Sequence, residues 1–139
     1  MISSSSSSSG SSGGGSGAAV LAYAQRFVGN PYKWGGTSLT KGADCSGFTL
    51  AVYRNFGISL PHSSRAQANC GTKISVSDVK PGDLIFFTGT YSAGTPVTHV
   101  GIYIGNGQMI HAGDPVQYAN INTSYWTEHF YAFGRISTN

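Results

Sequence analysis

Three side chains in this sequence have the chemistry of a nucleophile and its proton acceptors. Cys45 lies in the segment GADCSGF, and His99 and His111 stand twelve positions apart in the segment HVGIYIGNGQMIHA. A thiol becomes a strong nucleophile when a neighbouring base takes its proton, and imidazole is the side chain best suited to that exchange near neutral pH. The chain therefore has the residue types for thiol catalysis, provided that its fold brings them together.

Cys45 is predicted to lie in the first turn of a helix. Asp44 is a good N-cap residue, and apolar side chains recur at helical spacing over residues 45–56. The unpaired N–H groups of a helix start favour a negative sulfur, so we expect the pKa of this thiol to fall below its usual value of about 8.5. Ser46 and Gly47 are small enough to let a substrate backbone approach. The alternative is a buried cysteine that only happens to begin a helix.

His99 and His111 flank the sequence Gly-Asn-Gly, which is typical of a β-hairpin turn. Successive side chains of a strand point to opposite faces. The even-numbered residues of the first strand are apolar, so His99 points to the other face. Whether His111 shares that face depends on the length of the turn.

Two turn lengths have opposite consequences. A two-residue turn pairs Ile102 with His111 and puts His111 on the apolar face. A three-residue Gly-Asn-Gly loop, with Gly107 left-handed in a G1 bulge, pairs Gly101 with His111 and puts both histidines on one face. This second arrangement buries Ile110 instead of a histidine, so we predict it.

The remaining elements are predicted to be helices first and strands later. Residues 18–28 and 45–56 have helical spacing of apolar side chains, and residues 63–70 begin with hydroxyl caps. After a Pro-Gly pair come short segments rich in β-branched and aromatic residues, which are LIFF, HVGIYIG, QMIHA, VQYANI and FYAFGRI. This order is typical of an α+β domain, with helices packed on an antiparallel sheet of about five to six strands.

Composition narrows the class of partner. Residues 1–17 are nearly all serine and glycine and predict a linker or expression remnant without fixed structure, which leaves residues 18–139 as one domain. Only 9% of residues are charged, and the basic ones are scattered, which argues against nucleic acid as a partner. No apolar stretch is long enough to span a membrane. A hydroxyl-rich surface with few charges fits a wall polymer better.

Cys45 and Cys70 are the two cysteines of the chain. A disulfide between them is the alternative to a free thiol in a secreted domain. The ligand spacings of zinc sites are absent.

Five motifs occur in order along the chain: NPYKWGG, GADCSGF, LPHSSRAQ, KPGDLIFF and HVGIYIGNGQMIHA. In this order they resemble the NlpC-type (NlpC/p60) bacterial cell-wall cysteine peptidases, a papain-like family that cuts the stem peptides of peptidoglycan. The resemblance runs from about residue 19 to residue 136. It implies a groove between a helical half and the sheet, an extracellular or wall location, no cofactor or metal, and a monomer that is one module of a larger wall hydrolase.

The resemblance also implies roles for individual residues. Cys45 is the nucleophile, His99 the general base and acid, and His111 the residue that orients His99. Since a protonated His111 cannot accept a hydrogen bond from His99, we expect activity to fall below about pH 6. The backbone N–H of Cys45 and the hydroxyl of Tyr32 are the expected oxyanion donors. The residues expected to bind substrate are Trp34, Asp44, Ser46, Ser64 and Arg65.

Several alternatives remain open at this point. Tyr32 and Trp34 can instead pack on each other beneath their loop, and Asp44 can serve as a helix cap instead of binding the free L-alanine ammonium of the stem. The implied reaction is hydrolysis between D-γ-glutamate and the following diamino acid, either meso-diaminopimelate or L-lysine. The alternatives are an amidase that cuts between sugar and L-alanine, a non-catalytic wall-binding module, and a metal site built on the same side chains.

Two features depart from the family pattern. His62 stands where many members have arginine, and the segment GTYSAGTPVT before His99 is long. We expect that segment to border the groove and to narrow the range of substrates.

Overall fold

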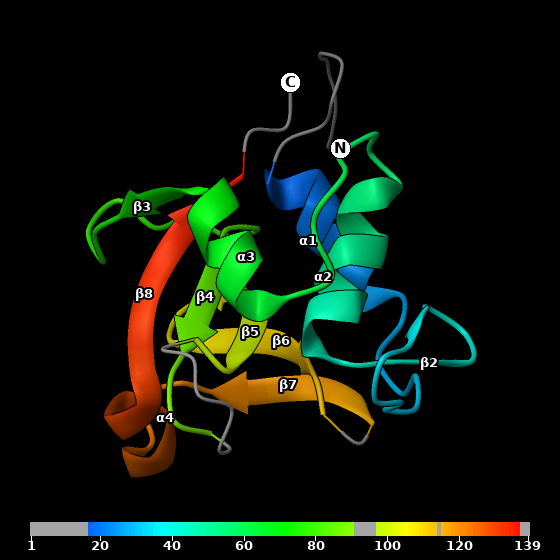
Figure 1. The fold of residues 1–139 in the computed structure, drawn as a ribbon. Helices are drawn as coiled ribbons and strands as arrows, with labels where there is room; N and C mark the ends of the chain where they lie inside the picture. The colour runs from blue at the N-terminus through cyan, green and yellow to red at the C-terminus, as the bar shows by residue number, and fades with distance from the viewer. Residues whose placement is uncertain (1–16, 91–96, 114, 137–139) are drawn as a thin grey trace, which may run out of the picture.

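A six-stranded antiparallel sheet carries the elements that position the candidate site (Figure 1). The computed structural model describes residues 17–90, 97–113 and 115–136. The strand order is β3-β8-β4-β5-β6-β7. These strands are β3 (Thr72–Ile74), β4 (Leu84–Phe87), β5 (His99–Gly105), β6 (Gln108–Ala112), β7 (Val116–Asn120) and β8 (Phe130–Arg135). The predicted α+β class with an antiparallel sheet is confirmed.

The described residues also form four helices and a small second sheet. The helices are α1 (Gly17–Gln25), α2 (Cys45–Arg54), α3 (Ser64–Cys70) and α4 (Ser124–His129). The small sheet pairs β1 (Thr37–Ser38) with β2 (Gly42–Ala43). In Figure 1, α1 and α2 lie together, and α4 lies far from them beside the start of β8. None of the helices in the described part of the chain has the length and apolar run that a bilayer crossing requires.

Parts of two predictions lie outside the described residues. These are the Ser/Gly-rich linker, apart from Gly17, and residues 91–96 of the segment expected to border the groove. Gly17 is the first residue of α1, so the helix begins one residue before the predicted domain boundary.

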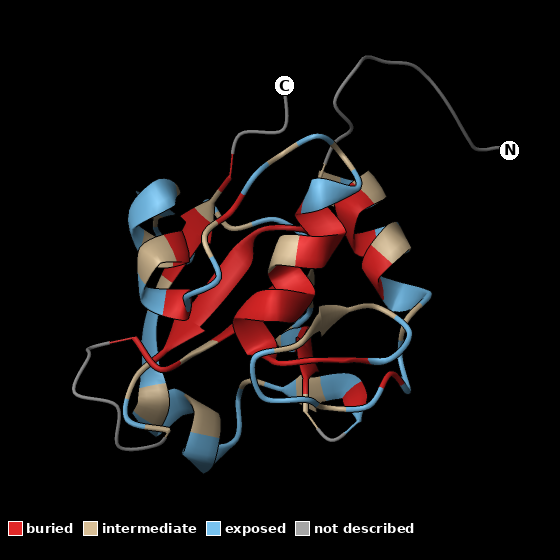
Figure 2. Ribbon diagram, turned by 45° about the vertical axis from the view of Figure 1, so that its right-hand side comes forward, coloured by how far each residue is buried: buried red, intermediate tan, exposed pale blue. Residues whose placement is uncertain are grey.

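The sheet separates two apolar clusters. The larger one, on the side of α1 and α2, contains Phe48 and Val52 of α2 packed with Val100 and Ile102 of β5. All four are fully buried, and Figure 2 shows this burial along α2 and the central strands. The smaller cluster is formed by Ile85, Phe87, Met109 and Phe133, with Trp126 of α4 packed against it. The odd-numbered residues of β5, including His99, point toward this second cluster.

The hairpin between β5 and β6 has the predicted facing but a different turn. The turn has two residues, because Gly105 pairs with Gln108, and Asn106 and Gly107 both have positive φ, 56° and 75°. This is the geometry of a type I′ turn. The predicted three-residue loop is therefore wrong, while the left-handed conformation of Gly107 is confirmed.

A bulge restores the register that the shorter turn would have lost. The pairing shifts between Tyr103 and Gly105, so that Ile104 is an extra residue on β5. Beyond the bulge, Ile102 pairs with Ile110, and continuing that register sets Gly101 opposite His111. Both histidines thus lie on one face, as predicted, because one extra residue in the strand has the same effect as one extra residue in the turn.

Gly101 makes the close approach of the two strands possible at this point. A Cβ atom there would lie 2.9 Å from the sulfur of Met109 and 3.2 Å from the Cβ of His111. Both distances are shorter than ordinary van der Waals contact, so a side chain at this position would displace Met109 and press against His111.

We expect Gly101→Val to lower the free energy of unfolding by about 1–3 kcal/mol through overpacking. Urea denaturation followed by circular dichroism measures this. Ile104→Val is the control on the same strand, with an expected loss of about 1 kcal/mol or less. A Gly101→Val variant as stable as the wild type would contradict the close packing of Gly101 on His111.

Candidate active site

Cys45 is the first residue of α2, as predicted, and its side chain lies at the junction of α2 and β5. The residue is 9% exposed. The Asp44 side chain caps the helix, since its Oδ1 accepts a hydrogen bond of 2.7 Å from the Gly47 backbone N–H. The predicted helix start and its cap are therefore confirmed.

The carboxylate of Asp44 also connects the two walls around Cys45. Its Oδ2 accepts a hydrogen bond of 2.9 Å from the Gly35 backbone N–H, and its Oδ1 lies 2.9 Å from Nε2 of His62. The Ser46 hydroxyl donates a longer bond of 3.4 Å to Oδ1. Asp44 thus holds the Trp34-Gly35 loop on one side and the His62 segment on the other. The role of Asp44 as a cap is directly observed.

A second buried network ties α3 to the first turn of α2. Gln67 is fully buried, and its Nε2 donates to the backbone oxygens of Ser46 and Pro61, both at 2.9 Å. Its Oε1 accepts a hydrogen bond from the Thr49 hydroxyl. Every hydrogen-bonding atom of the Gln67 amide group is thereby used, so the segment before α3 is fixed relative to the nucleophile.

The environment of Cys45 keeps its thiol protonated. Burial raises the pKa of Cys45 to about 11, and the negative charge of Asp44 acts in the same direction. Backbone N–H groups of Val100, Ser46 and Cys45 itself partly offset these effects. The expected lowering of the pKa by the helix start is therefore wrong, because loss of hydration outweighs the amide groups that face the sulfur.

His99 and His111 are joined directly. Nε2 of His99 and Nδ1 of His111 are 2.9 Å apart, and the two rings meet edge to face with centroids 5.0 Å apart. Two imidazoles share a hydrogen bond only when one supplies an N–H and the other a lone pair. The bond occupies Nε2 of His99 and leaves its Nδ1 for another group.

Both imidazoles are held in the neutral state. Burial, and next the proximity of His111, lower the pKa of His99 to about 3, while burial lowers the pKa of His111 to about 4. The cause is that packed side chains replace the water that would hydrate an imidazolium. The loss of activity expected below about pH 6 assumed that His111 becomes protonated there. With these lowered pKa values, both imidazoles are still neutral at pH 6.

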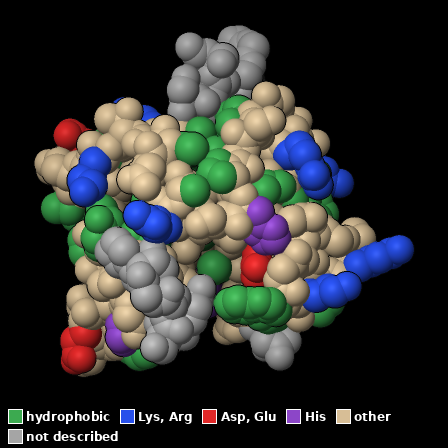
Figure 3. All heavy atoms as spheres, in the orientation of Figure 1, with side chains coloured by type: hydrophobic (Ala, Val, Ile, Leu, Met, Phe, Trp, Pro, Cys, Tyr) green, Lys and Arg blue, Asp and Glu red, His purple; other side chains and the backbone are tan. Residues whose placement is uncertain are grey.

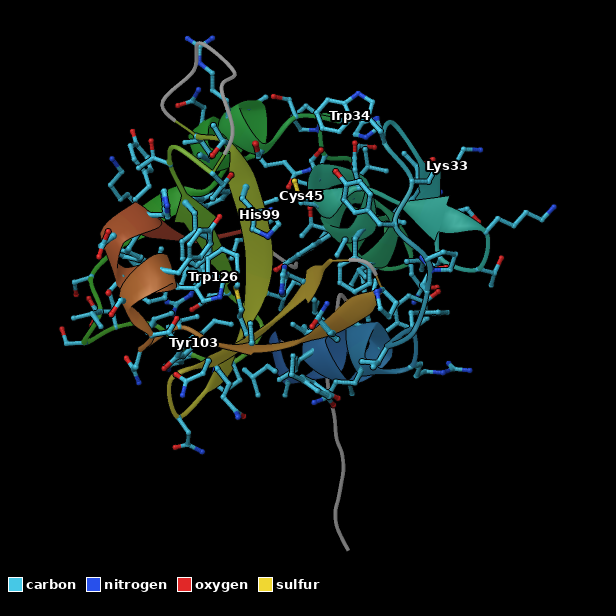
Figure 4. The ribbon with its side chains drawn as sticks, turned by 90° about the horizontal axis from the view of Figure 1, so that it is seen from below. Lys33, Trp34, Cys45, His99, Tyr103 and Trp126 are labelled. Carbon is cyan, nitrogen blue, oxygen red and sulfur yellow. The ribbon has the colours of Figure 1, made fainter. Side chains whose placement is uncertain are left out.

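Cys45 and His99 lie next to each other across the junction of α2 and β5. The backbone N–H of Val100, the residue after His99, faces the Cys45 sulfur. Figure 4 shows the two side chains side by side, between Trp34 on one side and Trp126 on the other. The thiol of Cys45, the neutral imidazole of His99 and the imidazole of His111 thus lie in a row.

A groove of about 290 Å³ opens beside Cys45. It is lined by Tyr32, Trp34, Gly35, Asp44, Cys45, Ser46, His62, Ser63, Ser64 and Val97. Of the predicted substrate-binding residues, all except Arg65 line it. Arg65 is exposed on α3. A larger concavity of about 540 Å³ between α1, α2 and β1 contains none of the predicted catalytic residues.

Tyr32 and Trp34 reach the groove from the loop before α2. A backbone bridge between Tyr32 and Ala43 holds this loop beside the helix start. Gly47 allows the close packing, because a Cβ there would collide with the carbonyl oxygen of Gly36. Trp34 is 69% exposed at the rim of the groove.

Cys45 and Cys70 are both free, so the alternative of a disulfide between them is wrong. Cys70 is exposed at the end of α3 and Cys45 is buried at the start of α2. The thiol of Cys45 is therefore available for chemistry.

The sequence analysis missed Trp126. This residue lies on α4, which was not predicted, and its indole packs on His99 with ring centroids 5.5 Å apart. The signal for α4 was Thr123, whose hydroxyl accepts the hydrogen bond of the Trp126 backbone N–H and so caps the helix.

Charged side chains are sparse around the site. On the face shown in Figure 3, lysine and arginine side chains are spread apart and do not form a continuous patch. The polar side chains that line the groove include Tyr32, Asp44, His62 and three serines, Ser46, Ser63 and Ser64.

Comparison with known proteins identifies relatives over most of the chain. A protein-family model for the NlpC/P60 family matches residues 29–135. The "Bifunctional muramidase/DL-endopeptidase CwlT" of Bacillus subtilis is 42% identical over 118 residues, which are 84% of this chain and 36% of the relative. The "Probable endopeptidase p60" of Listeria monocytogenes is 48% identical over 118 residues, which are 84% of this chain and 23% of the relative. The chain thus spans about a third or less of these relatives.

Solved structures share the fold. An NLP/P60 family protein of Staphylococcus aureus, described as similar to lipoprotein, has a TM-score of 0.81 and 42% identity, over 86% of this chain and 41% of that one. RipD of Mycobacterium tuberculosis has a TM-score of 0.71 and 28% identity, over 87% of this chain and 97% of that one. RipD is described as a non-catalytic NlpC/p60 domain protein adapted to peptidoglycan binding. The shared fold therefore does not by itself establish catalysis.

The neutral histidine pair makes the stability of the fold depend on pH. In the unfolded chain a histidine has a pKa of about 6.5, so it binds a proton between pH 6.5 and 5 that the folded state does not bind. Stability therefore falls as the pH falls, by on the order of 1–2 kcal/mol for each of His99 and His111 across that window.

Urea denaturation at pH 7.5, 6.5 and 5 measures this slope, and His111→Gln should reduce it by about half. A free energy of unfolding that stays constant from pH 6.5 to pH 5 would contradict the neutral state of the pair.

Proposed function

The chain belongs to the NlpC/P60 family, and we propose that it is a cysteine peptidase that hydrolyses amide bonds in the stem peptides of peptidoglycan. The observation that carries this proposal is the bond between Nε2 of His99 and Nδ1 of His111, next to a free Cys45 beside a groove. A wall-binding module would not need a thiol, a base and an orienting group in sequence. The relatives named endopeptidase support the same reaction class.

In the proposed reaction Cys45 is the nucleophile and His99 is the base. Nδ1 of His99 takes the thiol proton while the sulfur attacks the amide carbon. The imidazolium then protonates the leaving amine, which gives a thioester on Cys45. Water attacks this thioester, with His99 again as the base, and releases the carboxylic acid and the free thiol.

His111 fixes the tautomer that this reaction needs. With Nε2–H of His99 donating to Nδ1 of His111, the lone pair of His99 lies on Nδ1, toward Cys45. When His99 becomes an imidazolium, the same bond becomes charge-assisted and stronger. His111 is thus an orienting residue that also stabilises the charged intermediate.

The raised thiol pKa and the lowered imidazole pKa values support a neutral starting state. Proton transfer then accompanies the attack on the amide and does not precede it. The negative charge forms on the substrate oxygen, for which the Cys45 backbone N–H and the Tyr32 hydroxyl are the proposed donors. The Cys45 N–H lies at the free start of α2, and Tyr32 lines the groove.

We propose the bond between D-γ-glutamate and the following diamino acid as the one that is cut. The relative named DL-endopeptidase supports this choice. The substrate-binding residues in this proposal are Trp34, Asp44, Ser46 and Ser64, all of which line the groove. Because peptidoglycan lies outside the cytoplasmic membrane, we propose an extracellular or wall-associated location.

We expect Cys45→Ala to abolish hydrolysis of purified muropeptides, and Cys70→Ala to leave it unchanged. Mass spectrometry of the digest identifies the cut bond from its new ends. A new amine on the diamino acid supports the proposed peptidase. A new amine on L-alanine identifies the amidase instead.

Two further outcomes would overturn the mechanism. Full activity of Cys45→Ala would exclude the thiol, and loss of activity with EDTA would point to a metal site. A folded wild-type protein that binds muropeptides without cutting them would place the chain with the non-catalytic wall-binding modules.

We expect activity to persist down to about pH 5 and to be lost toward pH 4, because the lowered pKa values keep both histidines neutral to that point. We expect the Cys45 thiol to remain protonated up to pH 8 in the free enzyme, since burial raises its pKa to about 11.

The difference in absorbance at 240 nm between the wild type and Cys45→Ala reports the thiolate directly. A thiolate signal at pH 7, or activity that already falls by half at pH 6, would contradict the neutral starting state.

A further inference from the structure

The indole of Trp126 touches both imidazoles of the candidate site. It stacks on His99, with ring centroids 5.5 Å apart and planes inclined by 25°. Its edge-to-face contact with His111 has a centroid distance of 5.3 Å and an angle of 77°. Phe87 of β4 packs on the indole at 4.7 Å and on His99 at 6.1 Å. Among the described residues, Phe87 contacts the His99 ring and not the His111 ring, whereas Trp126 contacts both.

Trp126 is held rigidly by the short helix that carries it. The backbone N–H of Thr88, just after β4, donates to the carbonyl oxygen of His129, and Nδ1 of His129 lies 2.7 Å from the Thr88 oxygen. At the other end of α4, the Thr127 hydroxyl donates to the Thr123 carbonyl at 2.9 Å. The two contacts between His129 and Thr88 attach α4 to the end of β4, the strand next to β5. They fix the position of the Trp126 indole relative to the sheet.

We propose that Trp126 is a positioning residue that fixes the ring plane of His99 and keeps water from the hydrogen bond between His99 and His111. This inference rests on the proposed function for its catalytic meaning, although its structural part can be tested without any substrate.

The Trp126 indole limits both the rotation and the hydration of the His99 ring. A histidine at the first residue of a strand can rotate about its side-chain bonds, and rotation would break the bond from Nε2 to His111. A stacked indole permits the ring to slide in its plane but opposes tilting out of it. The indole also covers the ring faces that water would otherwise reach, and water would compete for the same nitrogens.

Other titratable groups lie on the elements next to the pair. Cys45, with Asp44 beside it, lies at the start of α2. Tyr125, His129 and the exposed Glu128 lie on α4. Tyr125 packs edge to face on Trp126 at 4.8 Å. The side chain of His129 is engaged with the Thr88 oxygen. None of these groups places a charge between Trp126 and the imidazoles. Removal of the indole therefore changes the pKa values of the two imidazoles mainly through their hydration and their freedom to rotate.

The test compares Trp126→Ala and Trp126→Phe with the wild type and with Tyr131→Ala. Tyr131 is an exposed aromatic residue on β8 whose ring contacts Lys73, so it is a control for the loss of a surface aromatic group. NMR titration of the histidine ring C–H signals from pH 7.5 to pH 5 reads the protonation of His99 and His111, which are assigned with His→Gln variants.

We expect no titration of the two rings in the wild type and in Tyr131→Ala. In Trp126→Ala the midpoint of at least one ring should rise by one pH unit or more and enter this range. On muropeptides the same variant should lose about 10- to 100-fold in kcat, with KM changed by less than about threefold. Trp126→Phe retains a stacked ring and should recover most of both properties.

A folded Trp126→Ala variant whose histidines stay silent down to pH 5, or whose kcat equals that of the wild type, would overturn the proposal. If Trp126→Ala does not fold, Trp126→Leu is measured in its place, and an unchanged titration there has the same meaning. If the wild type has no peptidase activity, the proposed function fails, but the titration still decides whether Trp126 shields the pair.

Discussion

The register of β5 against β6 determines whether His99 and His111 lie on one face of the sheet, as the proposed base and its proposed orienting partner must. Side chains alternate faces along a strand, so a slip of one residue would move His111 into the apolar cluster beneath α2 and leave His99 alone. The bulge at Ile104 and the two-residue turn at Asn106 and Gly107 together prevent that slip. The hydrophobic core enforces the same choice, because it takes up Ile110 in place of His111. Catalytic geometry and core packing therefore depend on one pairing.

Cys45, the proposed nucleophile, is positioned in a different way, through hydrogen bonds of buried side chains. Asp44 and Gln67 each bridge two segments that are distant in sequence, and both side chains are buried. Asp44 connects the loop before α2 with His62, and Gln67 connects the first turn of α2 with the segment before α3. Buried polar groups are costly unless they are satisfied, so these networks favour one arrangement of the groove walls. Hydrogen bonds of Asp44 and Gln67 thus connect the walls of the groove to the start of α2.

Local patterns predicted most elements, and non-local packing accounts for what they missed. The cap at Asp44, the apolar face of α2 and the strands from Leu84 onward follow from rules that act within a few residues. A bulge was predicted at Gly107, whereas the structure has it at Ile104. The sequence around Ile104 permits either turn, and only the fit of both strands to the core selects one. The pKa of Cys45 was predicted in the wrong direction for the same reason: the helix start is local, whereas burial comes from the whole fold. Trp126 was missed because its partners lie on β5 and β6.

Burial of the site has a chemical consequence that the residue types alone do not reveal. Cys45, His99 and His111 all carry no charge at rest, so the free enzyme avoids the large cost of a buried ion pair. In the proposed reaction, charge appears only as the substrate reacts, in a space already lined by groups that favour it. Backbone N–H groups of Val100 and Ser46 face the sulfur, and the indole of Trp126 lies over the ring that becomes an imidazolium. These fixed dipoles need no rearrangement when the charge forms, which is the condition under which electrostatic stabilisation is most effective.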